Sequence, residues 1–174
     1  MQDLFPIYDY FGDTVRYSLG TKGLKTLFCI GINPSTATKE KSDNTIRKLE
    51  KISYLHGYDS WIMLNIYPKR ATDPDNLDKE FNKDIHEKNL QIIKKYVKAN
   101  SDILCAWGNS INKRKYLKDC LAAIYELISK EVGVKYFHLN NVTKRGNPRH
   151  ILYSPLNSKI ETFPFKNYIK MLTQ

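Results

Sequence analysis

The sequence predicts a three-layer α/β/α fold, in which helices cover both faces of a central, mainly parallel sheet of four strands. Four short apolar runs rich in β-forming residues alternate with three longer segments whose apolar residues recur at helical spacing. This alternation is typical of parallel strands joined by right-handed helical crossovers, which bring the carboxyl ends of the strands to one edge of the sheet. The predicted strands are residues 27–32, 61–66, 103–107 and 134–139.

The segment before the first of these strands predicts a small N-terminal hairpin. Aromatic and β-branched residues at positions 6–19 flank the turn residues Gly12 and Asp13. We expect this hairpin to lie at an edge of the sheet or to cover it.

The first strand of the sheet ends in a polar loop. Gly31 permits close approach to the backbone, and Pro34 fixes φ and stops the strand. Ser35 and Thr36 then offer hydroxyl groups as caps or anion contacts. Ligands bind just beyond such strand ends in open parallel sheets, so this loop is the first part of a predicted site.

Helices are predicted between the strands and near the end of the chain. The first follows a capping sequence at residues 42–45 and extends to Gly57, and the third stops before Gly133. A polar loop at residues 140–157 precedes the last helix. The predicted helices are residues 43–57, 85–100, 113–132 and 165–172.

Length and composition predict one domain spanning residues 1–174. No apolar run approaches the roughly 18 residues of a membrane span, and the N-terminus lacks a basic region followed by an apolar one. We therefore expect a cytoplasmic protein without a membrane partner; its oligomeric state is left open. Cys29, Cys105 and Cys120 lie in apolar patterns without metal-ligand spacing, which predicts reduced core residues.

The chain carries a formal net charge of +10, from 28 Lys and Arg against 18 Asp and Glu. A polyanionic partner is one interpretation of this surplus. The alternative is that a lysine-rich composition reflects codon bias and only solvates the surface.

Amide, imidazole and indole side chains follow the predicted strands. Asn33, Asn65, Trp107 and His150 would share one edge of the sheet, where amides pair with the polar edge of a nucleobase and an aromatic ring stacks on it. The sequence shows no carboxylate pair, Cys/His ligand cluster, Gly-rich phosphate loop or nucleophile elbow. These absences argue against metal-dependent hydrolysis, nucleoside triphosphate cleavage and serine hydrolase chemistry.

Each of these residues also has a structural interpretation. Asn33 could cap a turn before proline, Asn65 could bind loop backbone groups, and Trp107 could belong to the core. The loop arginines could be solvated charges, although arginines beside a base pocket commonly meet phosphates.

Motif segments spread over nearly the whole chain resemble a bacterial and phage domain family of unknown function that is marked by an Asn-Pro-Ser-Thr-Ala motif. This resemblance implies no particular reaction. The matching segments are residues 15–17, 31–37, 43–47, 57–58, 65, 70–72, 106–108, 143–150 and 152–153.

A more distant resemblance is to the uracil-DNA glycosylase superfamily, with the motifs in the same order and at similar spacing. After His150 the sequence departs from the superfamily pattern, because Ser154-Pro155-Leu156 stands further along the chain than in the usual His-Pro-Ser-Pro-Leu segment. The matching residues are Gly31, Asn33 and Pro34 after the first strand, Asn65 after the second, 106–108 at the third and His150 after the fourth.

The glycosylase resemblance implies hydrolysis of a base–sugar bond without a metal or organic cofactor. Asn33 would position the attacking water, Asp43 would activate it if it reaches the site, and His150 would stabilise the departing base. Base binding would fall to Asn65, Trp107, Gly31 and Pro34. Contacts to phosphates are expected from Ser35, Thr36, Arg47, Arg70, Lys144, Arg145 and Arg149.

The resulting hypothesis is a nucleobase N-glycosidase of the DNA glycosylase type, acting on a flipped base. Its partner would be nucleic acid, with DNA favoured over RNA, or a nucleotide. Two alternatives stay open at this point: a non-catalytic module that binds nucleic acid or a nucleotide, and an enzyme acting on a free modified nucleoside or nucleotide. Whether the chain is an enzyme at all is thus undecided by its sequence.

Overall fold

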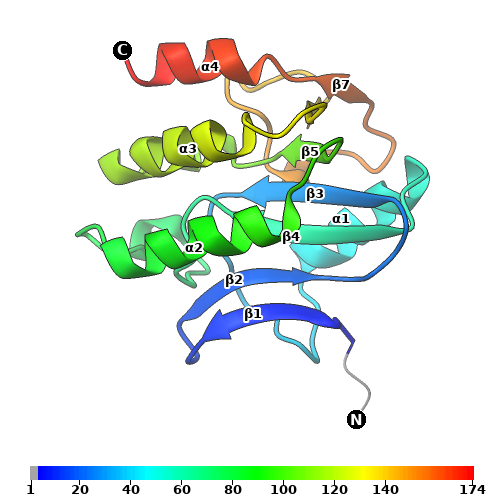
Figure 1. Cartoon of the computed structure of the whole chain (residues 1–174), viewed down its shortest axis with the longest axis horizontal. Helices are drawn as coiled ribbons and strands as arrows, with labels where there is room; N and C mark the ends of the chain where they lie inside the picture. Colours follow the sequence, from blue (N-terminus) through cyan, green and yellow to red (C-terminus); the bar gives the residue numbers. More distant parts are fainter. Residues whose placement is uncertain (1–3) are drawn as a thin grey trace.

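Seven strands form one mixed sheet at the centre of the computed structural model, which describes residues 4–174 (Figure 1). The strand order is β1-β2-β4-β3-β5-β6-β7. The strands are β1 (Ile7–Phe11), β2 (Val15–Gly20), β3 (Thr26–Gly31), β4 (Ser60–Asn65), β5 (Asp102–Cys105), β6 (Lys135–Leu139) and β7 (Ile160–Thr162).

The four predicted strands are confirmed as the parallel centre of the sheet, β4-β3-β5-β6. The predicted total of four strands is wrong. The hairpin β1–β2 continues the sheet, since β2 pairs antiparallel with β4 through Ser18 opposite Leu64 and Gly20 opposite Ile62. At the other edge, β7 pairs antiparallel with β6 and was not predicted, because its three residues carry too little pattern to be recognised.

The central strands are apolar on both faces because both faces are covered. Along β3, Phe28 and Ile30 pack in the larger part of the core, while Leu27 and Cys29 pack in the smaller part against α1. The carboxyl ends of the parallel strands lie at one edge of the sheet, where the polar loops leave it.

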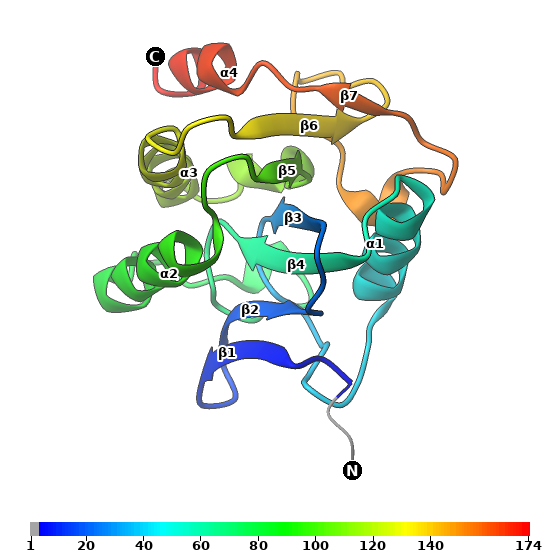
Figure 2. The same cartoon turned by 45° about the vertical axis from the view of Figure 1, so that its right-hand side comes forward.

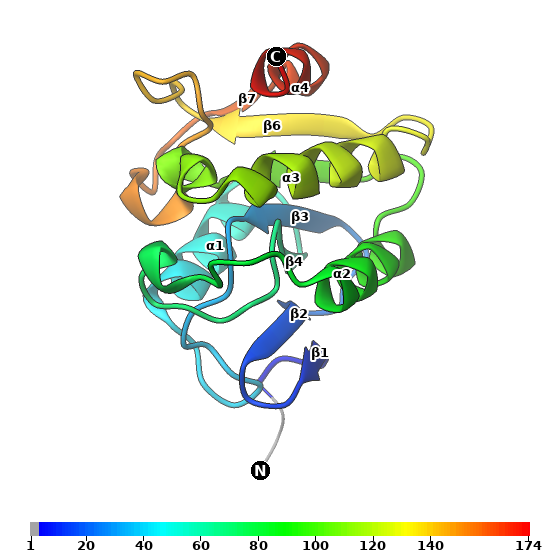
Figure 3. The same ribbon diagram turned by 90° about the vertical axis from the view of Figure 1, so that its left-hand side faces the viewer.

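Four helices complete the three layers, with α1 on one face and α2, α3 and α4 on the other (Figures 2 and 3). The Asp43 side chain caps α1 by accepting from Ile46 N, and the Asn82 side chain caps α2 by accepting from Ile85 N. All four predicted helices are present: α1 and α3 are shorter than predicted, α2 begins and ends earlier, and α4 has the predicted bounds. They are α1 (Asn44–Leu55), α2 (Lys83–Tyr96), α3 (Lys115–Ile128) and α4 (Phe165–Leu172).

The register between β1 and β2 shifts by one residue. Asp9 lies opposite Ser18 and Tyr10 lies opposite Arg16, which leaves Tyr17 without a partner. Such a bulge interrupts the alternation of side chains along a strand. Leu19 packs on the α1 side of the sheet, whereas Tyr17 packs beside α2.

The three cysteines are free and buried, as expected. Burial raises the pKa of Cys29 and of Cys120 to about 12, and it also raises the pKa of Cys105. Among residues 4–174, no helix is long and apolar enough to cross a membrane. The predicted domain and N-terminus include residues 1–3, which lie outside the described part.

Two strand glycines give a matched test of this packing. An alanine Cβ at Gly20 would come within 2.4 Å of Trp61 O, a backbone atom, whereas at Gly31 it would meet the Met63 methyl group at 2.5 Å. We expect Gly20→Ala to cost about 3 kcal/mol in the free energy of unfolding, since backbone of the neighbouring strand would have to move. Gly31→Ala should cost less than about 1 kcal/mol, since a flexible thioether can turn away. Urea denaturation measures both, and equal losses would contradict the packing described.

Candidate functional site

A cleft of about 650 Å³ opens at the carboxyl ends of the parallel strands, on the face of the sheet that α1 covers. Its walls come from the loops after β3, β4, β5 and β6 and from the first turn of α1. The lining residues are Arg16, Ile32, Asn33, Ser35, Thr36, Asp43, Asn44, Thr45, Ile46, Met63, Ala71, Thr72, Pro74, Gly108, Asn109, Ser110, Thr143, Arg149, His150, Leu152 and Tyr153.

The loop after β3 is fixed at the Ala37 peptide. The Ala37 carbonyl accepts hydrogen bonds from Arg16 Nη1 at 2.9 Å and from Arg70 Nη1 at 3.0 Å, and the Ala37 N–H donates to Asp43 Oδ2 at 3.1 Å. Asp43 Oδ1 accepts from Ile46 N in α1. These bonds connect the hairpin, the loop after β4 and the start of α1 through the backbone of one residue, Ala37.

The Asn33 side chain is hydrogen-bonded through its amide nitrogen, while its amide oxygen is free among the described residues. Its Nδ2 donates to Pro34 O at 2.9 Å and to Ala71 O at 2.8 Å, which fixes the orientation of the amide. Within residues 4–174, Asn33 Oδ1 has no hydrogen-bond partner, and the side chain lines the cleft. Asn33 therefore presents an oriented acceptor to a ligand.

His150 presents a donor. Its Nδ1 accepts from Leu152 N at 3.2 Å, which places the proton of the neutral ring on Nε2. Burial lowers the pKa of His150 below its ordinary value; Lys48 also lowers it, and Asp43 acts in the opposite direction. The ring is therefore neutral at pH 7 and can donate from Nε2 into the cleft.

Asn65 is completely buried, and neither Oδ1 nor Nδ2 has a hydrogen-bond partner in the described part of the chain. Asn65 and Met63 are two residues apart on β4, so their side chains point to the same face of the sheet. A Cβ built on Gly31 would lie 2.5 Å from Met63 Cε and 3.4 Å from Asn65 Oδ1. The unpaired amide thus lies beside the Met63 side chain, which lines the cleft.

Trp107 does not reach the cleft. It is 0% exposed and packs against Phe163, Phe165 and Tyr168, so it cannot stack on a base bound there. Its Nε1 donates to Tyr168 Oη at 3.1 Å. The C-terminal segment supplies these aromatic partners, and the sequence pattern around Trp107 alone does not reveal them.

A chain of hydrogen bonds leads from this aromatic cluster to the cleft wall. Tyr168 Oη donates to Asn147 Oδ1 at 2.7 Å, and Asn147 Nδ2 donates to Asn109 Oδ1 at 2.9 Å. Thr143 Oγ1 donates to the same oxygen at 2.8 Å. Asn109 Nδ2 is left without a partner among the described residues, so Asn109 offers an oriented donor to the cleft.

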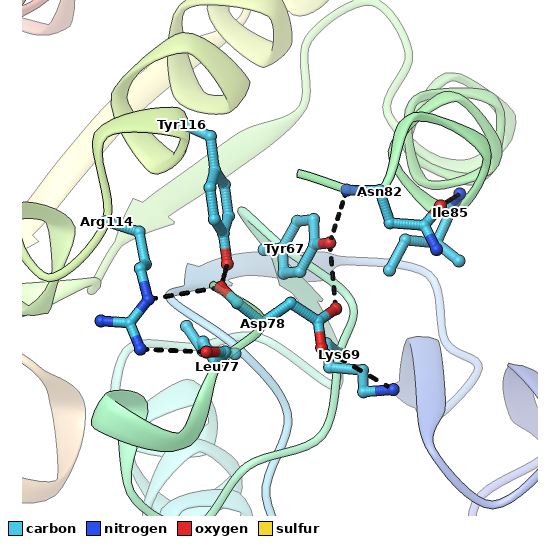
Figure 4. A network of polar contacts seen from close by, with 8 residues as sticks. All are labelled: Tyr67, Lys69, Leu77, Asp78, Asn82, Ile85, Arg114 and Tyr116. Carbon is cyan, nitrogen blue, oxygen red and sulfur yellow. Dashed lines mark hydrogen bonds and ion pairs between the residues drawn. The ribbon is translucent and has the colours of Figure 1, made fainter. Parts of the chain in front are cut away.

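Residues at the starts of α2 and α3 hold the connection after β4 in place (Figure 4). Arg114 donates to Leu77 O and Asp78 O, and Tyr116 Oη donates to Asp78 O at 2.8 Å. Tyr67 Oη donates to Asp78 Oδ2 at 3.3 Å and accepts from Asn82 N at 3.1 Å. These contacts fix the connection that carries Ala71, Thr72 and Pro74 into the cleft lining.

The residues predicted to contact phosphates divide into two groups. Ser35, Thr36 and Arg149 line the cleft. Arg70 lies outside the lining because its guanidinium is occupied by Ser35 O, Ala37 O and Tyr8 Oη. The remaining predicted contacts also lie outside the lining, on exposed positions: Arg47, Lys144 and Arg145.

The predicted base contacts Gly31 and Pro34 lie behind the cleft surface rather than on it, with Pro34 buried. Arg16 and Met63 are among the lining residues that were not predicted from the sequence. The sequence offered one signal for Arg16, because a positive charge within an apolar, aromatic strand is unusual. Among residues 4–174, no three His, Cys, Asp or Glu side chains lie close enough to hold a metal ion.

The sequence model of one family, described as "Protein of unknown function (DUF1643)", matches residues 16–152. The chain belongs to this family. No curated protein and no solved structure matches it. The DUF1643 match agrees with the expected domain of unknown function, and the similarity to uracil-DNA glycosylases stays a prediction.

The DUF1643 region contains every residue of the cleft lining except Tyr153, whereas β1, β7 and α4 lie outside it. The description of the DUF1643 family states no reaction.

Burial of His150 predicts a pH-dependent stability. Because its pKa is lowered on folding, the unfolded chain takes up the proton at a higher pH than the folded protein does. The contribution of the neutral ring is therefore complete above the ordinary pKa of 6.5 and is lost as the pH falls. His86 and His138 act in the same direction, since burial also lowers their pKa values.

We expect His150→Asn, which keeps an acceptor for Leu152 N but does not titrate, to lose less stability than wild type between about pH 7 and about pH 5.5. Urea denaturation at the two pH values measures the difference. Equal losses in the two proteins would contradict a buried neutral ring at position 150.

Proposed function

We propose that this DUF1643 protein is a nucleobase N-glycosidase, which hydrolyses the bond between base and sugar in a nucleotide whose base has entered the cleft. The observation that carries the proposal is the buried amide of Asn65, with its unpaired donor and acceptor next to the cleft. Leaving a buried polar group unpaired costs about 1–3 kcal/mol, and the edge of a nucleobase offers a matching acceptor and donor. A bound base would remove this cost.

Access to Asn65 requires a movement of Met63, because the amide is completely buried beside that side chain. The Met63 methyl group occupies the space that a side chain at position 31 would fill, and methionine changes rotamer easily. A base that displaces the thioether would lie between Asn65 and the groups on the cleft wall. The enclosed position favours a flipped or free base over one stacked in a duplex.

The cleft contains groups suited to breaking a base–sugar bond. Water would attack C1′ while the C1′–N bond breaks and its electron pair leaves with the base. The Nε2–H of neutral His150 would donate to an oxygen of the departing base anion, and Asn33 Oδ1 would orient the water. Asp43 is the one acidic side chain in the described cleft lining, and it would take the proton from water and stabilise the cationic sugar.

The resemblance of the strand-end residues to uracil-DNA glycosylases supports this reaction class, and the net charge of +10 supports a nucleic-acid substrate, with DNA favoured over RNA. A second candidate is a binding module without catalysis. One observation favours it: both Asp43 oxygens already accept backbone N–H bonds, so this carboxylate already has a structural role at the start of α1.

The experiment is release of free base from oligonucleotides that contain uracil, mismatched thymine or 5-modified pyrimidines, run beside a panel of free nucleosides. His150→Ala should lower the rate of base release by about two to three powers of ten with little change in binding, since a positioned donor to a developing anion contributes about 3 kcal/mol. Asn65→Ala should broaden the range of bases that are accepted.

His56→Ala is the matched control, because His56 caps the far end of α1, outside the cleft lining, where its ring bonds to Ile52 O. Its rate should equal that of wild type. Binding without base release from any substrate would favour the binding module. An unchanged rate in His150→Ala would refute the role given to the imidazole.

A further inference from the structure

Arg16 is a charged side chain buried at the inner end of the cleft. It is 2% exposed and lines the cleft, yet its guanidinium makes only one hydrogen bond within the described structure, from Nη1 to Ala37 O at 2.9 Å. Its Nε is buried without a partner. Unpaired donors on a buried cation are costly, so an anionic ligand is the natural partner for this group.

Asp43 offsets only part of the positive charge at this point. Arg70 donates to the same carbonyl as Arg16, which places two guanidinium groups side by side. Neither arginine forms a salt bridge within residues 4–174, and both oxygens of the nearby Asp43 accept backbone N–H bonds. Burial and Arg70 together lower the pKa of Arg16 to about 10, so Arg16 stays charged at pH 7.

Neutral hydrogen-bond donors also line the cleft. Asn44 and Thr45 belong to the first turn of the 12-residue helix α1, where backbone N–H groups have no intrahelical acceptor and the helix dipole favours an anion. The hydroxyl-bearing residues Ser35 and Thr36 line the cleft beside them. Guanidinium, helix N-terminus and hydroxyls together form the donor set that proteins use for phosphate.

We propose that the cleft binds a phosphate group of its nucleotide against Arg16, at the N-terminus of α1. The inference rests on the proposed function only for the nucleotide nature of the ligand, since the phosphate site itself follows from the donors. The phosphate belongs either to a free 5′-mononucleotide or to the backbone of an oligonucleotide. Both share the chemistry that Arg16 recognises.

The first test uses inorganic phosphate as the probe, with chloride at equal ionic strength as the reference. Phosphate should raise the midpoint of thermal unfolding of wild type, because a ligand that binds only the folded state stabilises it. Arg16→Gln should abolish the shift, while Lys130→Gln, which removes an exposed charge just beyond the C-terminal end of α3, should keep it. No shift in wild type, or an equal shift in Arg16→Gln, overturns the proposal.

Thr36→Val, which removes a hydroxyl from the cleft lining, covers the case in which Arg16→Gln does not fold, and it should weaken the phosphate shift without changing a charge. Calorimetry on wild type gives a measurement that needs no variant: deoxyuridine 5′-monophosphate should bind at least about tenfold more tightly than deoxyuridine, the gain expected of charge-assisted hydrogen bonds. Equal affinities overturn the proposal.

A uracil-containing oligonucleotide with hydroxyl ends then separates the two sources. Binding as tight as that of the mononucleotide assigns the site to a backbone phosphate, and weaker binding assigns it to a terminal one. A phosphate shift without any base release leaves this site standing and removes the glycosidase. Base release that is equally fast from nucleoside and nucleotide, without a phosphate shift, removes the phosphate site and leaves the glycosidase standing.

Discussion

The backbone of Ala37 holds the candidate site together. Its carbonyl accepts from Arg16 on β2 and from Arg70 after β4, and its N–H donates to Asp43 at the start of α1. Three parts of the chain that are distant in sequence therefore meet at the loop after β3. The arrangement brings two cations and the single negative charge of Asp43 together in a largely buried place, and an anionic ligand would offset the remaining positive charge. The same contacts that shape the cleft thus also give it a preference for negatively charged ligands.

The parallel centre of the sheet could be predicted because a strand covered on both faces is a continuous apolar run, and β3 and β4 have this pattern. The full extent of the sheet could not be predicted from the sequence. Whether a hairpin joins a sheet depends on pairing between distant segments, here β2 with β4, and local pattern does not encode that choice. β7 is three residues long with Glu161 at its centre, so it has no recognisable alternation.

Part of the site could be predicted, because some of its residues lie in the loops that follow the predicted strands. Asn33 lies in the loop after β3 and His150 in the loop after β6, at the predicted edge of the sheet, and both line the cleft. Trp107 follows β5 at the same edge of the sheet, but aromatic rings from the C-terminal segment enclose it in the core. A local sequence motif does not reveal such long-range packing. Arg16 was missed for a related reason, since its importance depends on burial against Ala37, which only the folded chain creates.

The central claim is that the cleft recognises a nucleobase through Asn65 after Met63 moves. A crystal structure of the protein with a bound free base, obtained by soaking uracil, thymine and cytosine separately, tests this directly. The account predicts a base whose polar edge is hydrogen-bonded to Asn65 Oδ1 and Nδ2, with the Met63 methyl group displaced from Gly31. A base bound in the cleft while Met63 still covers an unpaired Asn65, or no base bound there at saturating concentration, would contradict it.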